Sequence, residues 1–197
     1  MDKALSQTIR TVRESVVYQC PFGTVRDDEV TFRDGTPGTY LTVTPGDGNP
    51  GVVVIPWAQG RLGLVQVYRY PIGAPQWGFP RGFAHGPDPL VSAREELREE
   101  LGLVADLSLI GWFTPDSGIQ DSRVAVVLAQ ADHAASAPVD VNEILDTQWV
   151  APAQLWALLG QPTHDDGMTM AALALAIAQD SIPALSREVA RHRPEGV

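Results

Sequence analysis

Residues Trp77–Leu103 read WGFPRGFAHGPDPLVSAREELREELGL, a glycine- and proline-rich segment followed by regularly spaced leucines and glutamates. The spacing predicts a helix over Pro89–Leu101. Asp88 is a suitable N-cap, Pro89 fits the first helical position, and Gly102 stands where helices commonly end. At about 3.6 residues per turn, the apolar side chains of this helix share one stripe that we expect to pack on the core: Leu90, Ala93, Leu97 and Leu101.

Three glutamates of the same helix, Glu96, Glu99 and Glu100, fall on an arc roughly 100° wide that is separate from the apolar stripe. Arg94 and Arg98 lie on the other flank and are poorly placed to neutralise all three. Like charges at this spacing cost about 0.2–0.5 kcal/mol per pair even when exposed. A hard divalent cation such as Mg²⁺ or Mn²⁺ would offset that cost, because carboxylate oxygens are its usual ligands. Taken alone, the carboxylates are more typical of a solvated acidic surface, because charge runs usually face water.

The spacing of these residues resembles a known motif. Glu96–Leu103 is similar to the second half of the Nudix box, G-x5-E-x7-R-E-U-x-E-E-x-G-U, where U is apolar. Phe79–Gly82 resembles the L-P-A-G segment that opens the box in ADP-ribose pyrophosphatase-like members, and Tyr68–Pro71 resembles their Q-Y-R-x strand end. Asp166–Thr169 is similar to the D-G-x-T start of a late helix in these proteins. The resemblance to the Nudix superfamily covers about residues 16–180.

The resemblance implies an α/β fold, the Nudix α/β/α sandwich with a mixed central sheet. We expect this Nudix domain to span residues 49–197. The β-rich segment 1–48 resembles the small subdomain through which similar family members form homodimers with exchanged strands. A homodimer is therefore expected.

The rest of the chain alternates strand and helix signals. Turn residues and apolar alternation predict strands at Val16–Cys20, Glu29–Phe32, Thr39–Thr44, Gly51–Trp57, Leu62–Tyr70, Leu107–Phe113, Arg123–Gln130 and Asp146–Val150. Further helices are expected near Ala151–Leu159, Gly167–Gln179 and Leu185–His192. The four residues Ala58–Arg61 form a hairpin-sized break, and Pro71–Pro87 is expected to be a loop.

Two features depart from the Nudix box. The arginine that precedes its first glutamate is replaced by Glu95, which lies at i,i+4 from Glu99 and repels it. The loop is also one residue short, and Asp88 replaces the glutamate that follows six positions after the glycine. These changes affect the residues that support the metal ligands, and we expect them to bear on catalytic rate more than on fold.

The resemblance assigns roles to particular residues. It implies that Glu96, Glu99, Glu100 and the backbone carbonyl of Arg81 bind the metal. Glu143 lies in a loop where similar proteins place a general base, although an exposed loop acid would look the same.

Arg69 and Arg81 are candidates for holding substrate phosphate or ribose, since guanidinium groups match those oxygens. A surface position for Arg69 is equally compatible with the sequence. Trp77 is a candidate for stacking on a nucleobase, and its alternative is ordinary packing. The four histidines show no ligand spacing.

The resemblance bears on substrate as well. ADP-ribose-type members usually carry S-P-G where this chain has Asp116-Ser117-Gly118, with Pro115 just before it. ADP-ribose is therefore the leading substrate, while nucleotide sugars and dinucleotide polyphosphates stay open.

Composition excludes several classes of protein. The chain of 197 residues has a formal charge of −10, with 14 basic and 24 acidic residues, which argues against binding a nucleic acid backbone. The single cysteine, Cys20, leaves no intrachain disulfide or CxxC site and suggests a reducing compartment, the cytoplasm. Lys3 is the only lysine, which argues against Walker-A and pyridoxal enzymes. No apolar run is long enough for a transmembrane helix, and the N-terminus lacks the apolar core of a signal peptide.

Three functions are compatible with the sequence. The first is metal-dependent hydrolysis of a nucleoside diphosphate linked to another moiety, yielding AMP and a sugar phosphate from ADP-ribose-like substrates. The second is a Nudix module that binds a nucleotide ligand with little or no turnover. The third is an interaction protein in which the acidic helix is incidental.

Overall fold

The structure is a computed structural model of the whole chain, and it describes residues 9–83, 86–134 and 142–191. The chain divides into two compact units. The first comprises Met1–Asn49 together with Thr114–Ser122, and the second comprises Pro50–Phe113 and Arg123–Val197. The first unit thus ends one residue beyond the division expected after residue 48, and it also includes residues 114–122, which no sequence pattern assigns to it.

The second unit is built on a seven-stranded mixed sheet. Its strands are β5 (Gly51–Ala58), β6 (Arg61–Arg69), β7 (Ala74–Gly78), β8 (Arg81–Gly82), β9 (Asp106–Phe113), β10 (Val124–Ala131) and β11 (Ile144–Val150). Five of them follow the order β11-β6-β5-β10-β9, while β7 pairs with β6 and β8 pairs with β5. The β5–β10 pair is parallel, and the other neighbouring strands are antiparallel.

Strands β5 and β6 pair only next to the turn that joins them, and they separate farther along. The residues inserted at this separation include several that were expected to form the site. The two strands pair at Trp57–Leu62 and Ala58–Arg61. Farther along, β6 pairs with β7, with Val65 opposite Gly78, and β5 pairs with β8, with Val53 opposite Arg81. The short segment that carries Gly78 and Arg81 is therefore inserted beside the two central strands.

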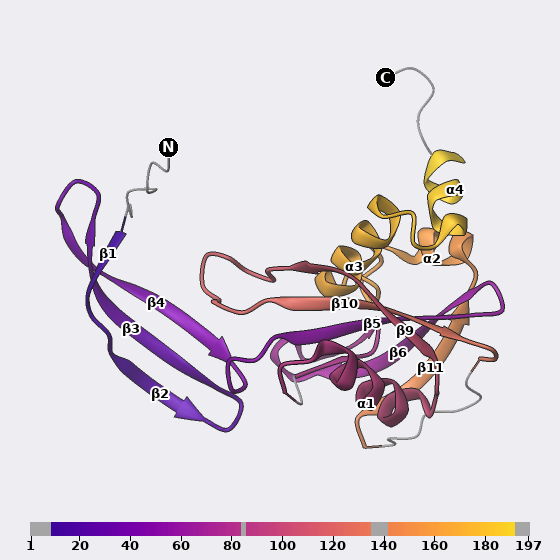
Figure 1. Cartoon of the computed structure of the whole chain (residues 1–197), viewed down its shortest axis with the longest axis horizontal. Coiled ribbons are helices and arrows are strands. Elements are labelled where there is room, and N and C mark those ends of the chain that lie inside the picture. The colour runs from indigo at the N-terminus through magenta and orange to yellow at the C-terminus, as the bar shows by residue number, and fades with distance from the viewer. Residues whose placement is uncertain (1–8, 84–85, 135–141, 192–197) are drawn as a thin grey trace. The chain divides into compact units, whose positions relative to one another are not determined.

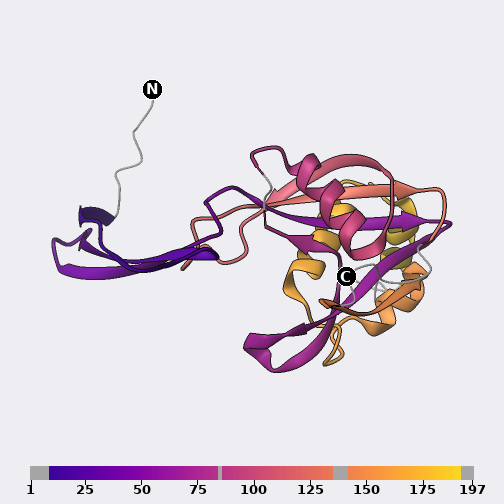
Figure 2. The ribbon, with the colours of Figure 1, turned by 90° about the horizontal axis from the view of Figure 1, so that it is seen from below.

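Helices cover both faces of this sheet (Figures 1 and 2). The apolar runs of β5 and β10 are continuous because both faces of these strands are buried. One core forms between alternate residues of these strands and α2–α4, and it includes Val53, Ile55, Val126, Leu155, Ala172 and Leu185. The other core forms against α1 and includes Val52, Val54, Val127, Ala93, Leu97 and Leu101. This arrangement is the expected α/β/α sandwich with a mixed central sheet.

Helix α1 (Pro89–Leu101) forms where the sequence predicts it. The Asp88 carboxylate accepts a hydrogen bond from the Leu90 N–H at 2.9 Å, which confirms the predicted N-cap. Gly102 ends the helix with φ of 63°, a conformation that costs glycine little. The caps fix the start and end of α1 and therefore the direction of each glutamate on it.

The remaining helices are α2 (Pro152–Leu158), α3 (Gly167–Ala178) and α4 (Pro183–Arg191). Asp166 caps α3 by accepting a hydrogen bond from the Thr169 N–H at 2.9 Å. Among the residues that the structure describes, no single helix is long and apolar enough to cross a membrane. Helices α3 and α4 satisfy that test only together, and they are bent by 95° at the break between them.

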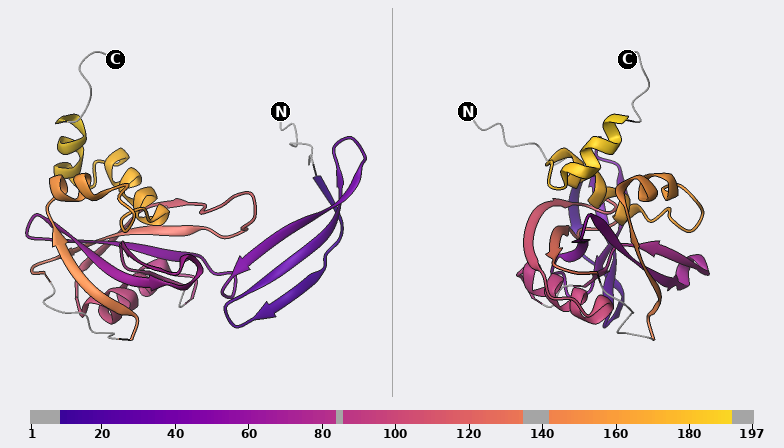
Figure 3. Two further views of the ribbon diagram at one scale, coloured as in Figure 1. Left: turned by 180° about the vertical axis from the view of Figure 1, so that it is seen from behind. Right: turned by 90° about the vertical axis from the view of Figure 1, so that its right-hand side faces the viewer.

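The first unit contains an antiparallel sheet of β1 (Ile9–Arg13), β2 (Val16–Cys20), β3 (Gly23–Phe32) and β4 (Pro37–Pro45), seen again in Figure 3. Its segment 114–122 is anchored to β4, since the Val43 N–H donates to the Ile119 carbonyl at 2.8 Å. Asp121 also accepts hydrogen bonds from Arg26 at 3.0 Å and from Thr44 at 2.7 Å. Large apolar side chains are exposed on this sheet: Val12, Val16, Val17, Tyr18, Phe22 and Leu41.

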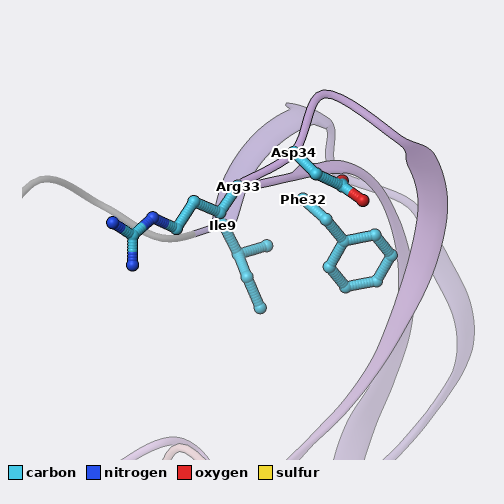
Figure 4. Close-up of a pocket in the computed structure, with 4 residues that line it drawn as sticks. All are labelled: Ile9, Phe32, Arg33 and Asp34. Carbon is cyan, nitrogen blue, oxygen red and sulfur yellow. The ribbon is translucent and has the colours of Figure 1, made fainter.

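A shallow hollow of about 570 Å³ lies at one end of the same sheet (Figure 4). Its lining residues are Ile9, Phe32, Arg33 and Asp34. None of the site residues expected from the sequence lines it, so we assign it no part in the chemistry.

The structure corrects three expectations about secondary structure. Residues 71–87, expected to be a loop, contain a short 3-10 turn (Tyr70–Ile72), β7 and β8. The turn residues in this segment signal breaks, but the hydrogen bonds of a neighbouring strand hold the backbone extended. Strand β1 was not expected, and β3 begins at Gly23 rather than Glu29. Both carry polar side chains on an exposed sheet, so neither shows the apolar alternation of a half-buried strand.

Candidate metal and phosphate site

The three glutamates of α1 do not share one environment. Glu96 and Glu100 are buried, with 9% and 7% of their surface exposed. Glu99 faces solvent, and its carboxylate pairs with the Arg98 guanidinium at 3.0 Å. One helical turn separates Glu96 from Glu100, so these two carboxylates lie on the same side of the helix. The side chain of Glu99 is directed away from that side, toward Arg98. The three glutamates therefore form a buried pair, Glu96 and Glu100, with Glu99 exposed beside it.

The buried pair lies against the backbone of Arg81 and Gly82. The Arg81 N–H donates a hydrogen bond to the Glu100 carboxylate. At Gly82, an added Cβ would overlap the Glu96 carboxylate. Only a glycine leaves room for this approach. The segment that resembles L-P-A-G thus contacts the carboxylates directly.

The electrostatics of Glu100 are unfavourable to its charged form. Burial raises the pKa of Glu100 to about 8, and repulsion from Glu96 and Glu143 adds to that increase. The Arg81 N–H and the Arg69 guanidinium act in the opposite direction. Its Oε2 atom is buried and has no hydrogen-bond partner in the described part of the chain. An acceptor left in this state indicates a place for a positive group.

The donors fit a hard divalent cation. Two buried carboxylates adjoin one another, and one of them has an unused oxygen. Within the described residues, however, no three His, Cys, Asp or Glu side chains lie close enough to form a ready-made ligand set. The side chain of Glu99, the third glutamate expected from the sequence, pairs with Arg98 instead.

Two arginines lie beside the carboxylates. Arg69 ends β6 and Arg81 begins β8, and burial together with repulsion by Arg81 lowers the pKa of Arg69. The Arg69 Nε is buried without a hydrogen-bond partner among the described residues. Two guanidinium groups placed together, one with an unused donor, are suited to an anion such as a phosphate.

Arg81 is held from the other side by the start of α3. Its Nη1 donates to the Asp166 Oδ1 at 2.6 Å, and the two side chains are only 19% and 7% exposed. Thr169 donates to the other oxygen of Asp166 from its hydroxyl at 2.6 Å and from its backbone at 2.9 Å. The Thr169 hydroxyl in turn accepts a hydrogen bond from the Phe79 N–H at 2.9 Å.

Glu143 lies immediately before β11, whose first residue Ile144 is paired with Val67 of β6. This register places Glu143 toward the end of β6, where its charge acts on both Arg69 and Glu100. Glu143 is exposed. The preceding residues of that loop, 135–141, lie outside the described residues.

Trp77 is half-buried on β7, and the ring of His164 stacks against it with centroids 6.0 Å apart and planes 13° from parallel. The backbone N–H of Trp77 donates a hydrogen bond to the Thr163 carbonyl at 2.7 Å. The loop that carries Thr163 and His164 therefore lies against β7. Burial lowers the pKa of His164. No sequence pattern indicates this contact, because nothing in the spacing of the histidines links His164 to Trp77.

The structure thus gathers most of the expected residues and adds two. Arg81, Glu100 and Glu143 act electrostatically on Arg69, and Glu96 acts on Glu100. Glu99 pairs with Arg98 instead, and Trp77 contacts His164. In the sequence pattern, Asp166 and Thr169 mark only the start of a helix. The contact with Arg81 joins residues 85 positions apart, which no local spacing reveals.

Comparisons with known proteins agree with this architecture. The family model of the NUDIX domain matches residues 48–171. A crystal structure of an ADP compounds hydrolase superposes with a TM-score of 0.75 at 23% sequence identity, covering 92% of this chain and 97% of that one. None of the curated proteins compared with this chain matches it. Because the matched domain spans more than half of the chain, this protein belongs to the Nudix family of hydrolases.

Proposed function

We propose that this protein hydrolyses a nucleoside diphosphate linked to another moiety, with ADP-ribose-like compounds as the leading substrates and AMP and ribose 5-phosphate as the products from ADP-ribose. The observation that carries the proposal is the buried pair of Glu96 and Glu100 against the Arg81–Gly82 backbone. Two buried carboxylates so close together are costly unless a cation joins them. The ADP compounds hydrolase of similar fold supports the choice of substrate class.

Mg²⁺ or Mn²⁺ is the cofactor that we propose. Glu96, Glu99, Glu100 and the carbonyl of Arg81 would hold it, with Glu99 released from its exposed pair with Arg98. A bound divalent cation would polarise the phosphoryl oxygens and lower the pKa of a coordinated water. Glu96 and Glu100 would supply negative charge to the cation, and the cation would in turn favour the charged form of Glu100.

The remaining roles follow from position. Glu143 would act as the general base that accepts a proton from the attacking water, since it is the acid near the buried pair that lies on a loop. Arg69, with its unused Nε, and Arg81 would bind the diphosphate oxygens. Trp77, which packs against the core and stacks with His164, would contact the nucleobase with the exposed part of its ring.

We further propose that the protein works as a homodimer in the cytoplasm. The exposed apolar side chains of β2, among them Val16, Val17 and Tyr18, are more than half exposed and favour association with a second copy. The single cysteine suits a reducing compartment.

The proposed activity is tested with a panel of nucleoside diphosphate derivatives, incubated with Mg²⁺ or Mn²⁺ in ¹⁸O-labelled water. Mass spectrometry of the products reports turnover, the preferred substrate and the phosphorus that is attacked. We expect AMP and ribose 5-phosphate from ADP-ribose, with one ¹⁸O atom incorporated. Saturable binding without any product would instead identify a nucleotide-binding module and contradict the proposal.

A further inference from the structure

Asp166 and Thr169 form a buried connection between the start of α3 and the segment that carries Arg81. Asp166 uses Oδ1 for Arg81 and Oδ2 for Thr169, so both carboxylate oxygens are engaged. The Thr169 hydroxyl also accepts a hydrogen bond from the backbone N–H of Phe79, two residues before Arg81. Asp166, Thr169 and Phe79 are 6%, 4% and 0% exposed. The guanidinium of Arg81 is thereby fixed from a rigid helix end.

Strand β7 packs closely against the Asp166 and Thr169 side chains at Gly78. A Cβ at Gly78 would lie 2.9 Å from the Thr169 hydroxyl and 3.0 Å from an oxygen of Asp166. Strand β7 therefore approaches α3 at a distance that only glycine permits. The helix end and the strand are held in one relative position, and Arg81 follows directly after this contact.

The charges around Arg81 explain why such a connection is needed. Burial lowers the pKa of Arg69, and repulsion from Arg81 lowers it further, while Asp166 attracts Arg69 and pairs with Arg81. Without Asp166, the mostly buried Arg81 side chain would lose its ion pair, and repulsion from Arg69 would favour another position of the guanidinium. Asp166 thus allows two guanidinium groups to stay together before any anion is bound.

We propose that Asp166 and Thr169 are positioning residues, which hold Arg81 beside Arg69 so that the two guanidinium groups bind the diphosphate of the substrate as a preformed unit. The proposal rests on the assignment of Arg81 to substrate phosphate under the proposed function. Arg81 stands where the L-P-A-G segment has alanine, so the arrangement needs an arginine that this segment does not supply. Neither Asp166 nor Thr169 contacts the reacting atoms.

The test uses Asp166→Asn in the full chain. Asparagine is an equally good N-cap, and its Oδ1 still accepts from Thr169, while its amide cannot accept from Arg81. The variant therefore removes the Arg81 contact and keeps α3 capped. Asp165→Asn is the matched control, because this neighbouring exposed carboxylate contacts Gln76 at 2.9 Å instead of Arg81.

Two measurements are made on wild type, Asp166→Asn, Arg81→Gln and the double variant. Steady-state kinetics on ADP-ribose gives KM and kcat, and calorimetry with α,β-methylene-ADP in the presence of Mn²⁺ gives diphosphate affinity without turnover. We expect Asp166→Asn to raise KM and weaken binding about tenfold, with kcat much less affected. In the Arg81→Gln background the same change should have almost no further effect. Thr169→Ser should stay near wild type, whereas Thr169→Val should follow Asp166→Asn in direction.

The outcomes separate this inference from the proposed function. If wild type binds α,β-methylene-ADP but hydrolyses nothing, the proposed activity is wrong, and a binding loss in Asp166→Asn still supports positioning. Unchanged affinity in Asp166→Asn, or equal losses in the presence and absence of Arg81, would overturn the positioning role. Absence of diphosphate binding by folded wild type would overturn it as well.

Discussion

The carboxylate of Glu96 lies so close to the Cα of Gly82 that any side chain at position 82 would overlap it. Glu96 comes from α1 and Gly82 from β8, so the contact connects a helix on one face of the sheet to the edge of the inserted segment. The position of the Glu96 carboxylate therefore depends on the backbone of β8 as well as on α1.

We predict that Gly82→Ala displaces the Glu96 carboxylate and weakens Mn²⁺ binding by about tenfold or more, since loss of support around a metal site typically has effects of this size. Calorimetry with Mn²⁺ measures the affinity. Gly167→Ala is the control, because a Cβ there meets nothing within 4 Å. Equal affinities for Gly82→Ala and wild type would show that Glu96 is not a ligand.

Glu99→Gln is expected to lower turnover at least about tenfold while leaving the melting temperature nearly unchanged. The reason is that Glu99 is exposed and contributes to stability only through its pair with Arg98, and surface pairs of this kind are weak. Turnover of ADP-ribose and thermal melting are measured together. Asp106→Asn, another exposed acid of the same unit, is expected to change neither. A wild-type rate in Glu99→Gln would remove Glu99 from the metal site.

Glu100→Gln, in contrast to Glu99→Gln, is expected to stabilise the metal-free protein. The charged form of Glu100 is disfavoured by burial and by Glu96, so a neutral isostere should raise the melting temperature by a few degrees at pH 8.5 in EDTA. The stabilisation that wild type gains on adding Mn²⁺ should disappear in the variant. A lower melting temperature in EDTA, with the Mn²⁺ response intact, would contradict this account.

Glu143→Gln is expected to reduce kcat by about 100-fold or more, because general base catalysis typically contributes that much. Metal affinity should stay close to wild type, which distinguishes a base from a ligand. Steady-state kinetics and Mn²⁺ calorimetry on the same preparation give both values. If kcat is unchanged, the base lies elsewhere in the site.

The exposed apolar side chains of β2 predict self-association. Val17→Asp should convert a dimer to a 21.2 kDa monomer, because it places a charge among side chains that we expect to be buried between copies. Sedimentation velocity at micromolar concentration measures the mass. Val104→Asp is the control, since Val104 is 87% exposed and lies in the other unit. A wild-type chain that sediments as a monomer would disprove the dimer.

Local features of the sequence predicted the local parts of the fold. Helix α1 begins at Pro89 and ends at Leu101 as expected, because its caps, Asp88 and Gly102, act within a few residues of the helix ends. Strands β7 and β8 were missed because their extended backbone depends on hydrogen bonds from β6 and β5 rather than on their own glycines and prolines.

For the candidate site, the spacing on α1 indicated which glutamates matter but not how they differ. Glu96, Glu99 and Glu100 are equivalent in the sequence pattern, yet two are buried and one is exposed. The difference arises from the neighbouring backbone of Arg81–Gly82, which approaches one side of the helix.

By itself the sequence determined the family, the acidic helix and the two arginines, because each depends on residue type and on spacing within a few turns. Only the tertiary structure decided that Arg81 is paired with Asp166 and that Glu99 is turned away from the buried pair. The physical reason is that ion pairing and burial are set by atoms that are close in space. Residues 85 positions apart become neighbours only when α3 packs beside β7.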